Sequence, residues 1–357
     1  MENMKYIFQL SKLSLNNRQF IFKTMSMNTK SLILLSIIFS AIFTITLLYS
    51  TIELPHLINK FLLDVFPDYG FQWNEAEKFI NSIRPISYAC FIATIFLIII
   101  GFILKKSQLS FLGSFVLYLP TFSYFASVMF FLTGIGIIRI LWLPIIELFP
   151  GSWPEKIYAA SYFLELGDFI YMPYDMLRFI FMNLAKDFPL YIFDNTFFYL
   201  LVYLSSILFF LSCTSWFYAK FKGLKIIDFF IYKYSRHPQY LSFLIWSYGI
   251  LIYDKYVFYP PKGGYFASPP IFWLIVTFII LGLALYEEKR MVKNYGKIYI
   301  EYRNKSFFML PLPKIVSNLI LFPIKLIFKK DYPEKMIEIS SILIIYFLIL
   351  IIISIFY

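Results

Sequence analysis

The chain has 357 residues, of which 60% are hydrophobic and only 15% carry a charged side chain. Soluble domains carry about 25% charged residues, so this composition excludes an ordinary soluble domain and predicts an all-α, polytopic membrane protein. The formal net charge is +11, but the Lys and Arg residues stand in short blocks at the ends of apolar runs. Such blocks set membrane topology, so the charge does not predict a nucleic-acid partner.

Apolar runs predict about seven transmembrane helices, within a range of six to eight. They cover residues 31–52, 86–104, 111–132, 196–219, 238–253, 271–286 and 338–357. A span needs about 20 residues, so the fifth and sixth runs are short. The apolar stretch 134–149 contains Arg139, Pro144 and Glu147, and we expect it to be re-entrant or interfacial. The segment 151–195 mixes aromatic, proline and acidic residues, which predicts amphipathic pieces at the membrane surface.

Basic segments alternate with acidic or short ones along the chain. The basic segments are the tail before residue 31, residues 105–106, residues 220–236 and residues 289–305, whereas 53–84 and 150–195 are acidic. Because Lys and Arg are retained on the cytosolic side, the pattern predicts a cytosolic N-terminus in the cell membrane or the endoplasmic reticulum. The first apolar run lacks a small-residue cleavage site, so we expect it to be a retained anchor.

This pattern divides the chain into three predicted parts. Residues 1–195 form an N-terminal transmembrane extension with interfacial segments, 196–313 form a membrane core, and 314–357 hold an interfacial segment and a last transmembrane helix. Within the core, the connector 254–270 contains three Pro-Pro or Gly-Gly pairs, which mark turns. We therefore expect the two short helices on either side of it to form a hairpin.

The run Arg236-His237-Pro238-Gln239-Tyr240 stands at the start of the first of these short helices. Pro238 lacks an N–H and has a fixed φ, so it suits the first turn of a helix. It also disfavours helical geometry at His237, so we expect an extended backbone there, with donors and acceptors free for a ligand. Polar groups beside hydrocarbon are candidates for a functional site. The alternative is an interfacial cap that only contacts lipid headgroups.

Glu287 and Glu288 follow the second short helix, and we expect them to end it. Carboxylates at a helix C-terminus oppose the helix dipole, so a cation should offset them. The cation is either Lys289 and Arg290 or a cationic ligand. Adjacent helical residues point about 100° apart, so one carboxylate can face the interior while the other faces solvent.

Tyrosine residues recur after the two carboxylates. Tyr295, Tyr299 and Tyr302 follow spacings of four and three, which places them on one face of an amphipathic helix over 288–303. Gly296 permits a close approach of a neighbouring backbone or a ligand. A tyrosine stripe taken alone is more typical of packing than of a binding site.

Together these motifs resemble the isoprenylcysteine carboxyl methyltransferase and phospholipid methyltransferase superfamily. That family has an Arg-His-Pro-x-Tyr turn, a helical hairpin, a Glu-Glu pair, a Gly-x-x-Tyr-x-x-Tyr run and a closing Pro. The residues that match it are Arg236, His237, Pro238, Tyr240, Glu287, Glu288, Gly296, Tyr299, Tyr302 and Pro311. The match covers roughly residues 196–313.

The resemblance implies a methyltransferase that uses S-adenosyl-L-methionine and faces the cytosol, with an amphiphilic methyl acceptor that enters from the bilayer. It implies a cofactor site of Arg236, His237, Pro238, Tyr240, Glu287, Glu288, Tyr299 and Tyr302. It also implies a catalytic role for Glu288. The chain departs from the family at Ser242, where Gly is usual, and at Ser306, Phe307 and Phe308, where Val-Pro and an Arg are frequent. Arg303 and Lys305 are the nearest cations, so we expect them to take the place of that Arg beside the acceptor.

The expected chemistry is transfer of a methyl group from a sulfonium. Alignment and a dry pocket supply much of the catalysis, and a carboxylate acceptor needs neither a general base nor a metal. The chain has only two histidines, His56 and His237, and no run with metal-ligand spacing. Sequence leaves four alternatives open: a prenylcysteine methyltransferase, a phospholipid N-methyltransferase, a sterol-reductase-like enzyme that uses NADPH, and a non-catalytic membrane protein. It does not predict the oligomeric state.

Overall fold

The computed structural model describes residues 28–50, 73–104, 166–185, 188–257, 270–312, 314–330, 332–333 and 335–357, with short stretches between 109 and 159. Within these ranges the regular structure is helical, apart from one isolated bridge between Ser235 and Phe307. The prediction of an all-α fold is confirmed. Four described helices are long and apolar enough to cross a membrane, namely Thr29–Leu48, Arg84–Ile103, Leu190–Lys222 and Met336–Phe356.

Six of the predicted apolar runs coincide with helices. These helices are α2 (Thr29–Leu48), α4 (Trp73–Ile103), α11 (Leu190–Lys222), α12 (Pro238–Ile252), α13 (Pro270–Tyr295) and α16 (Met336–Phe356). The predicted span at 111–132 and the stretch 134–149 lie almost entirely outside the described residues. The count of seven crossings therefore stays a prediction. The predicted boundary at 195/196 falls inside α11, which continues without a break from Leu190.

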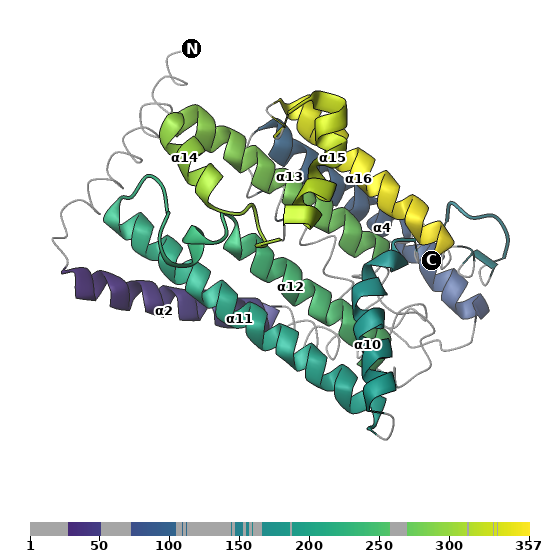
Figure 1. Cartoon of the computed structure of the whole chain (residues 1–357). Helices are drawn as coiled ribbons and strands as arrows, with labels where there is room; N and C mark the ends of the chain where they lie inside the picture. Colours follow the sequence, from purple (N-terminus) through teal and green to yellow (C-terminus); the bar gives the residue numbers. More distant parts are fainter. Residues whose placement is uncertain are drawn as a thin grey trace, which may run out of the picture.

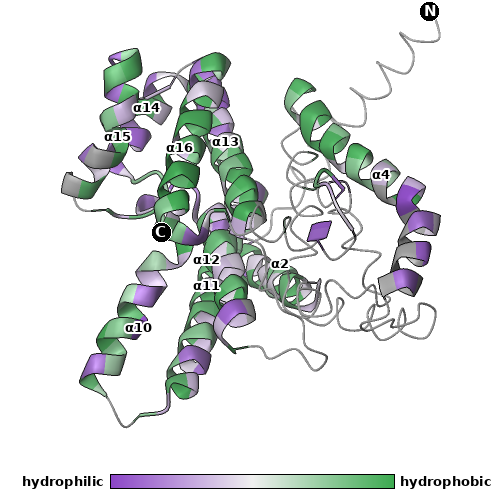
Figure 2. Cartoon of the chain, turned by 90° about the vertical axis from the view of Figure 1, so that its right-hand side faces the viewer, coloured by the Kyte–Doolittle hydropathy of each residue, from purple (hydrophilic) through white to green (hydrophobic). Residues whose placement is uncertain are grey.

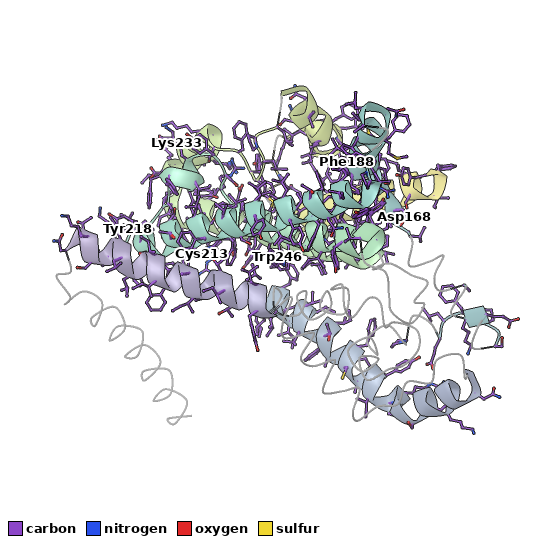
Figure 3. All side chains as sticks on the ribbon, turned by 90° about the horizontal axis from the view of Figure 1, so that it is seen from below. Asp168, Phe188, Cys213, Tyr218, Lys233 and Trp246 are labelled. Carbon is purple, nitrogen blue, oxygen red and sulfur yellow. The ribbon has the colours of Figure 1, made fainter. Side chains whose placement is uncertain are left out.

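Helix α11 lies at the centre of the bundle, between α2 and α12 (Figures 1 and 3). It runs antiparallel to α2, because Phe39 contacts both Phe217 and Phe221 while Phe43, one turn further along α2, contacts Phe217. Small polar residues of α2 face this interface and are buried: Ser36, Ser40 and Thr44. Small residues allow membrane helices to approach closely. Helix α2 of the predicted N-terminal extension is thus packed directly on the predicted core.

Helices α12 and α13 lie side by side and antiparallel (Figure 1). Trp273 near the start of α13 donates a hydrogen bond to Ser247 near the end of α12, with a distance of 2.9 Å. At the other end, Tyr240 of α12 donates to Glu287 of α13, also at 2.9 Å. This is the arrangement of the expected hairpin, although the connector 258–269 lies outside the described residues.

The antiparallel packing places the sequence motifs at one end of the bundle. The C-terminus of α11, the N-terminus of α12 and Glu287 of α13 all lie there. In Figure 3 the labelled residues Tyr218 and Lys233 lie at this end, whereas Asp168 and Phe188 lie at the opposite end. Phe278 of α13 contacts Phe347 of α16, with ring centroids 5.8 Å apart, so α16 lines the same bundle. We call the end that holds Arg236 and Glu288 the motif end.

The opposite end carries the amphipathic helix α10 (Met172–Leu184). In Figure 2, α10 mixes hydrophilic and hydrophobic residues, whereas most of α16 is hydrophobic. Its polar side is tied to the bundle: Arg178 forms an ion pair with the buried Asp194 of α11, and Asp175 accepts a hydrogen bond from Tyr256. Its other side exposes large apolar residues, including Met176, Phe179 and Met182. This amphipathic character agrees with the expectation for 151–195.

Two glycines at helix contacts give a first prediction. A Cβ at Gly249 would lie 3.1 Å from the Cβ of Leu201, which is fixed to the backbone of α11, whereas a Cβ at Gly282 would lie 3.1 Å from the mobile Cδ1 of Leu343. Alanine gains about 1 kcal/mol over glycine within a helix, and crowding offsets this gain where the neighbour cannot move. We therefore expect Gly249→Ala to unfold at a lower temperature in detergent than Gly282→Ala. The reverse order would contradict the packing of α11 on α12.

Candidate functional site

The backbone around Arg236 leads directly into α12. Pro238 is the first residue of this helix, as the sequence predicts, and His237 stands before it with φ −126° and ψ 55°. The expectation of free backbone groups is wrong for two of them, however. The N–H of Arg236 donates to the carbonyl of Phe307 at 3.0 Å, and the carbonyl of His237 accepts from Leu241 at 3.0 Å. Phe307 and the first turn of α12 therefore engage two of the four backbone groups that the sequence predicts to be free for a ligand.

Arg236, His237 and Glu288 form a buried ionic cluster at the motif end. The Nε of Arg236 lies 2.5 Å from Oε1 of Glu288, and the Nε2 of His237 lies 3.2 Å from the same oxygen. The side chains of Arg236 and Glu288 are only 2% and 3% exposed. A charge with so little exposure is stable only when it is paired and hydrogen-bonded. These three residues therefore depend on one another.

The guanidinium of Arg236 also joins three segments that are far apart in the sequence. Its Nη1 donates to the carbonyl of Arg303 at 2.7 Å and to the carbonyl of Ser306. Its Nη2 donates to the hydroxyl of Tyr332. With Nε on Glu288, each nitrogen of this side chain has a protein partner. The structure thus places Arg236, a predicted cofactor residue, where it holds the cluster together.

The pKa values of the ion pair follow from opposing causes. Burial alone would raise the pKa of the Glu288 carboxyl, but the hydrogen bond from His237 and the charge of Arg236 outweigh burial and hold that pKa below its ordinary value of 4.5. Burial lowers the pKa of Arg236, and the neighbouring Glu288 more than restores it, so the pKa of Arg236 is raised. Both groups are therefore ionised at neutral pH.

The lowered pKa of Glu288 predicts acid-induced loss of stability. Above pH 4.5 this carboxyl is ionised in the folded and unfolded states, and its stabilising contribution is fully present. As the pH falls below this value, the unfolded chain takes up the proton first, so stability is lost. We expect the melting temperature of the parent protein to fall more steeply from pH 5 to pH 3 than that of Glu288→Gln. If the melting temperatures of the two proteins fell equally steeply with pH, the pair of Glu288 with Arg236 would not govern the loss of stability in acid.

Helix α13 extends beyond Glu288 to Tyr295, so the expectation that the two carboxylates end a helix is wrong. They lie about two turns inside α13, and the helix dipole does not oppose them. The cation that offsets Glu288 is Arg236 rather than Lys289 or Arg290. Glu287 is half-buried and accepts the hydrogen bond from Tyr240, so both carboxylates face protein groups.

Aromatic rings border the ionic cluster. The ring of His237 stacks on Tyr240, with centroids 5.8 Å apart and an interplanar angle of 21°. Phe308 meets His237 edge-on at 5.2 Å, and the guanidinium of Arg236 lies 5.8 Å from the centre of the Phe308 ring. Phe308 was noted in the sequence only as a departure from the family pattern. Here it forms one wall of the site.

The expected single helix over 288–303 is interrupted at Gly296, which has φ +54°. A Cβ at this glycine would meet no atom within 4 Å, so its role is the positive φ rather than the predicted close approach. Helix α14 (Lys297–Lys305) then begins and carries Tyr299 and Tyr302 inward. Burial raises the pKa of Tyr302 to about 12 and also raises the pKa of Tyr299, so both hydroxyls are neutral.

Arg303 and Lys305 occupy different environments. The guanidinium of Arg303 lies 4.5 Å from the centre of the Tyr332 ring, next to the cluster, whereas Lys305 is exposed at the end of α14. The structure therefore brings Arg303 to the site together with most of the predicted cofactor residues. Tyr332 and Ser306 also belong to it; the sequence marks Ser306 only as a departure from the family pattern, and no local signal marks Tyr332.

Three buried polar atoms in or beside the cluster have no hydrogen-bond partner among the described residues: Ser235 Oγ, Glu288 Oε2 and Arg303 Nε. Buried polar atoms are normally paired, so these three favour a polar ligand or water at the site. In the described part of the chain, no group of three or more His, Cys, Asp or Glu side chains is arranged to hold a metal ion. Comparison of the chain with protein-family models, with curated proteins and with solved structures finds no match.

Proposed function

We propose that this protein is an S-adenosyl-L-methionine-dependent membrane methyltransferase that acts on a lipid-like or prenylated acceptor, of the isoprenylcysteine carboxyl O-methylation type. One observation carries the proposal. The Arg-His-Pro-x-Tyr turn and the Glu-Glu pair, which carry the family resemblance, meet through the contacts of Glu288 with Arg236 and His237 and of Glu287 with Tyr240. The turn and the carboxylate pair thus share one buried cluster, as a common site requires.

The residues at the site fit such a methyl donor. Glu288 Oε2 is buried without a partner, and Glu287 has one hydrogen bond from Tyr240 among several acceptor positions. Glu288 Oε2 and the carboxylate of Glu287 can each accept a hydrogen bond from the cationic groups of the donor. The rings of His237, Tyr240 and Phe308 offer flat apolar surfaces for an adenine. When bound, the donor supplies a methyl group on a positively charged sulfur.

The protein groups contribute electrostatics and exclusion of water. Buried carboxylates stabilise a nearby cation more strongly than they would in water, because the local dielectric constant is low. The hydrogen bond from His237 and the charge of Arg236 keep Glu288 ionised, as the lowered pKa of this carboxyl indicates. Arg303, at the edge of the cluster, can attract an anionic acceptor. A carboxylate acceptor needs no proton removed, so no general base is assigned to the site.

We place the site on the cytosolic side of the membrane. The motif end carries exposed basic residues from several segments: Lys220, Lys222, Lys225, Lys233, Arg290, Lys293, Lys297 and Lys305. Such an excess of Lys and Arg is typical of cytosolic segments. The acceptor then reaches the site from the inner leaflet.

The test is methyl transfer in membranes that contain the protein and a donor labelled on its methyl group. Label is expected to enter a lipid-like or prenylated molecule, and mild base is expected to release it as methanol, because methyl esters are base-labile. Base-stable label in phospholipid would reassign the enzyme to N-methylation. Absence of any label above that of membranes without the protein, for prenylated and phospholipid acceptors alike, would contradict the proposal.

A further inference from the structure

The segment that begins at the end of the predicted core leaves the motif end and returns to it. Ser306 and Tyr332 both bind the guanidinium of Arg236, through its Nη1 and Nη2. Between them, Met309 is buried against Leu241 of α12 and Ala284 of α13. The chain therefore enters the bundle after Ser306 and comes back to the same arginine.

Helix α15 (Lys314–Phe328) forms the returning part. The hydroxyl of Tyr346, about halfway along α16, donates to the carbonyl of Ile320. Helix α15 thus lies beside the first half of α16, as Figure 1 also shows. Residues 306–332, which we call the returning segment, are held at both ends by one buried side chain.

Tyr332 occupies a central place at the end of this segment. The centre of its ring lies 4.5 Å from the guanidinium carbon of Arg303 and 5.6 Å from that of Arg236. Arg236 and Arg303 carry like charges and would repel each other near this ring. The ring face attracts both cations, and Glu288 neutralises Arg236. The hydroxyl accepts from Arg236 and so fixes the orientation in which Nε of Arg236 points to Glu288.

We propose that Tyr332 is a positioning residue of the donor site: it holds Arg236 against Glu288 and Arg303 at the edge of the cluster. This inference rests on the proposed methyl transfer, and it places part of the active centre outside the 196–313 core. Without the hydroxyl, Nη2 of Arg236 loses its partner while Nε and Nη1 keep theirs, so the guanidinium is held less rigidly against Glu288. Tyr332 contacts neither reacting group and acts through these side chains.

Tyr332→Phe tests the hydroxyl while it keeps the ring, and Tyr346→Phe is the matched control. Both substitutions remove one tyrosine hydroxyl that holds the returning segment, but only Tyr332 contacts the cluster. We expect the dissociation constant of labelled S-adenosyl-L-methionine to rise about tenfold in Tyr332→Phe, the loss typical of one hydrogen bond to a charged group. We expect it to change less than twofold in Tyr346→Phe, with similar melting temperatures for both variants.

Three other outcomes are distinguishable. Equal donor affinity in Tyr332→Phe and Tyr346→Phe would overturn the positioning role. A lower melting temperature of Tyr332→Phe with unchanged affinity would reduce Tyr332 to a structural residue and would also overturn it. If the parent protein binds no donor, the proposed function fails instead. In that case, a double-mutant cycle of Tyr332→Phe with Arg236→Lys, measured by thermal stability, tests whether the two side chains interact. Additive effects would show that they are not coupled.

Discussion

Glu288→Gln is expected to reduce methyl transfer by a factor on the order of 10²–10³, comparable with removal of one preorganised electrostatic group from an active site. The substitution keeps the size of the side chain and removes its charge. Arg236 is then left as a buried cation without its carboxylate, although it is only 2% exposed. Loss of one partner from a buried ion pair costs about 3–5 kcal/mol, so stability should fall as well. Initial rates with labelled donor and melting temperature in detergent measure the two effects.

Glu301→Gln is the matched control for Glu288→Gln. Glu301 lies on α14 near the site, and its side chain is exposed, so its removal should change neither rate nor melting temperature appreciably. Loss of activity together with a lower melting temperature in Glu288→Gln, with both unchanged in Glu301→Gln, would place the carboxylate in the chemistry as well as in the packing. Full activity in Glu288→Gln would contradict the site assignment.

The second large effect is expected at the opposite end of the bundle. Asp194 is 1% exposed, and it accepts from the hydroxyl of Tyr174 at 2.5 Å and from Arg178 at 3.0 Å. Asp194→Ala leaves the buried Tyr174 hydroxyl unsatisfied and removes the counter-ion of Arg178. We expect a loss of about 3 kcal/mol in the free energy of unfolding, measured by denaturation in detergent.

Asp228→Ala serves as the control for this prediction, because Asp228 is exposed. The ion pair of Asp194 with Arg178 anchors α10 on α11, far from the motif end (Figures 1 and 3). Folded Asp194→Ala protein should therefore bind the donor as the parent does. If donor affinity fell together with stability, the two ends of the bundle would be coupled, contrary to the arrangement described here.

Local sequence rules predict the parts of the fold that depend on neighbouring residues. Pro238 begins α12 because its missing N–H and fixed φ suit a first turn. The apolar runs predict α2, α11 and α16 because their composition suits hydrocarbon. The pairing of the Arg236 turn with the Glu287-Glu288 pair was expected only through the family resemblance, since spacing alone does not show which side chains meet.

The errors arise where tertiary contacts override local signals. Helix α13 passes Glu288 without ending, and Arg236, in the turn before α12, neutralises that carboxylate. The backbone N–H of Arg236 is occupied because Phe307 lies beside it. Tyr332 joins the site across 96 positions of sequence, a distance that no periodicity reports. The predicted close approach at Gly296 is wrong, and its positive φ explains the glycine instead.

The most direct test of the central claim is equilibrium binding of S-adenosyl-L-methionine to the purified protein in lipid nanodiscs, with NADPH as the competing ligand. The account predicts saturable binding of the sulfonium donor, weakened in Glu288→Gln and unchanged in Glu301→Gln, with no displacement by NADPH. Saturable binding of NADPH without uptake of the donor would contradict it.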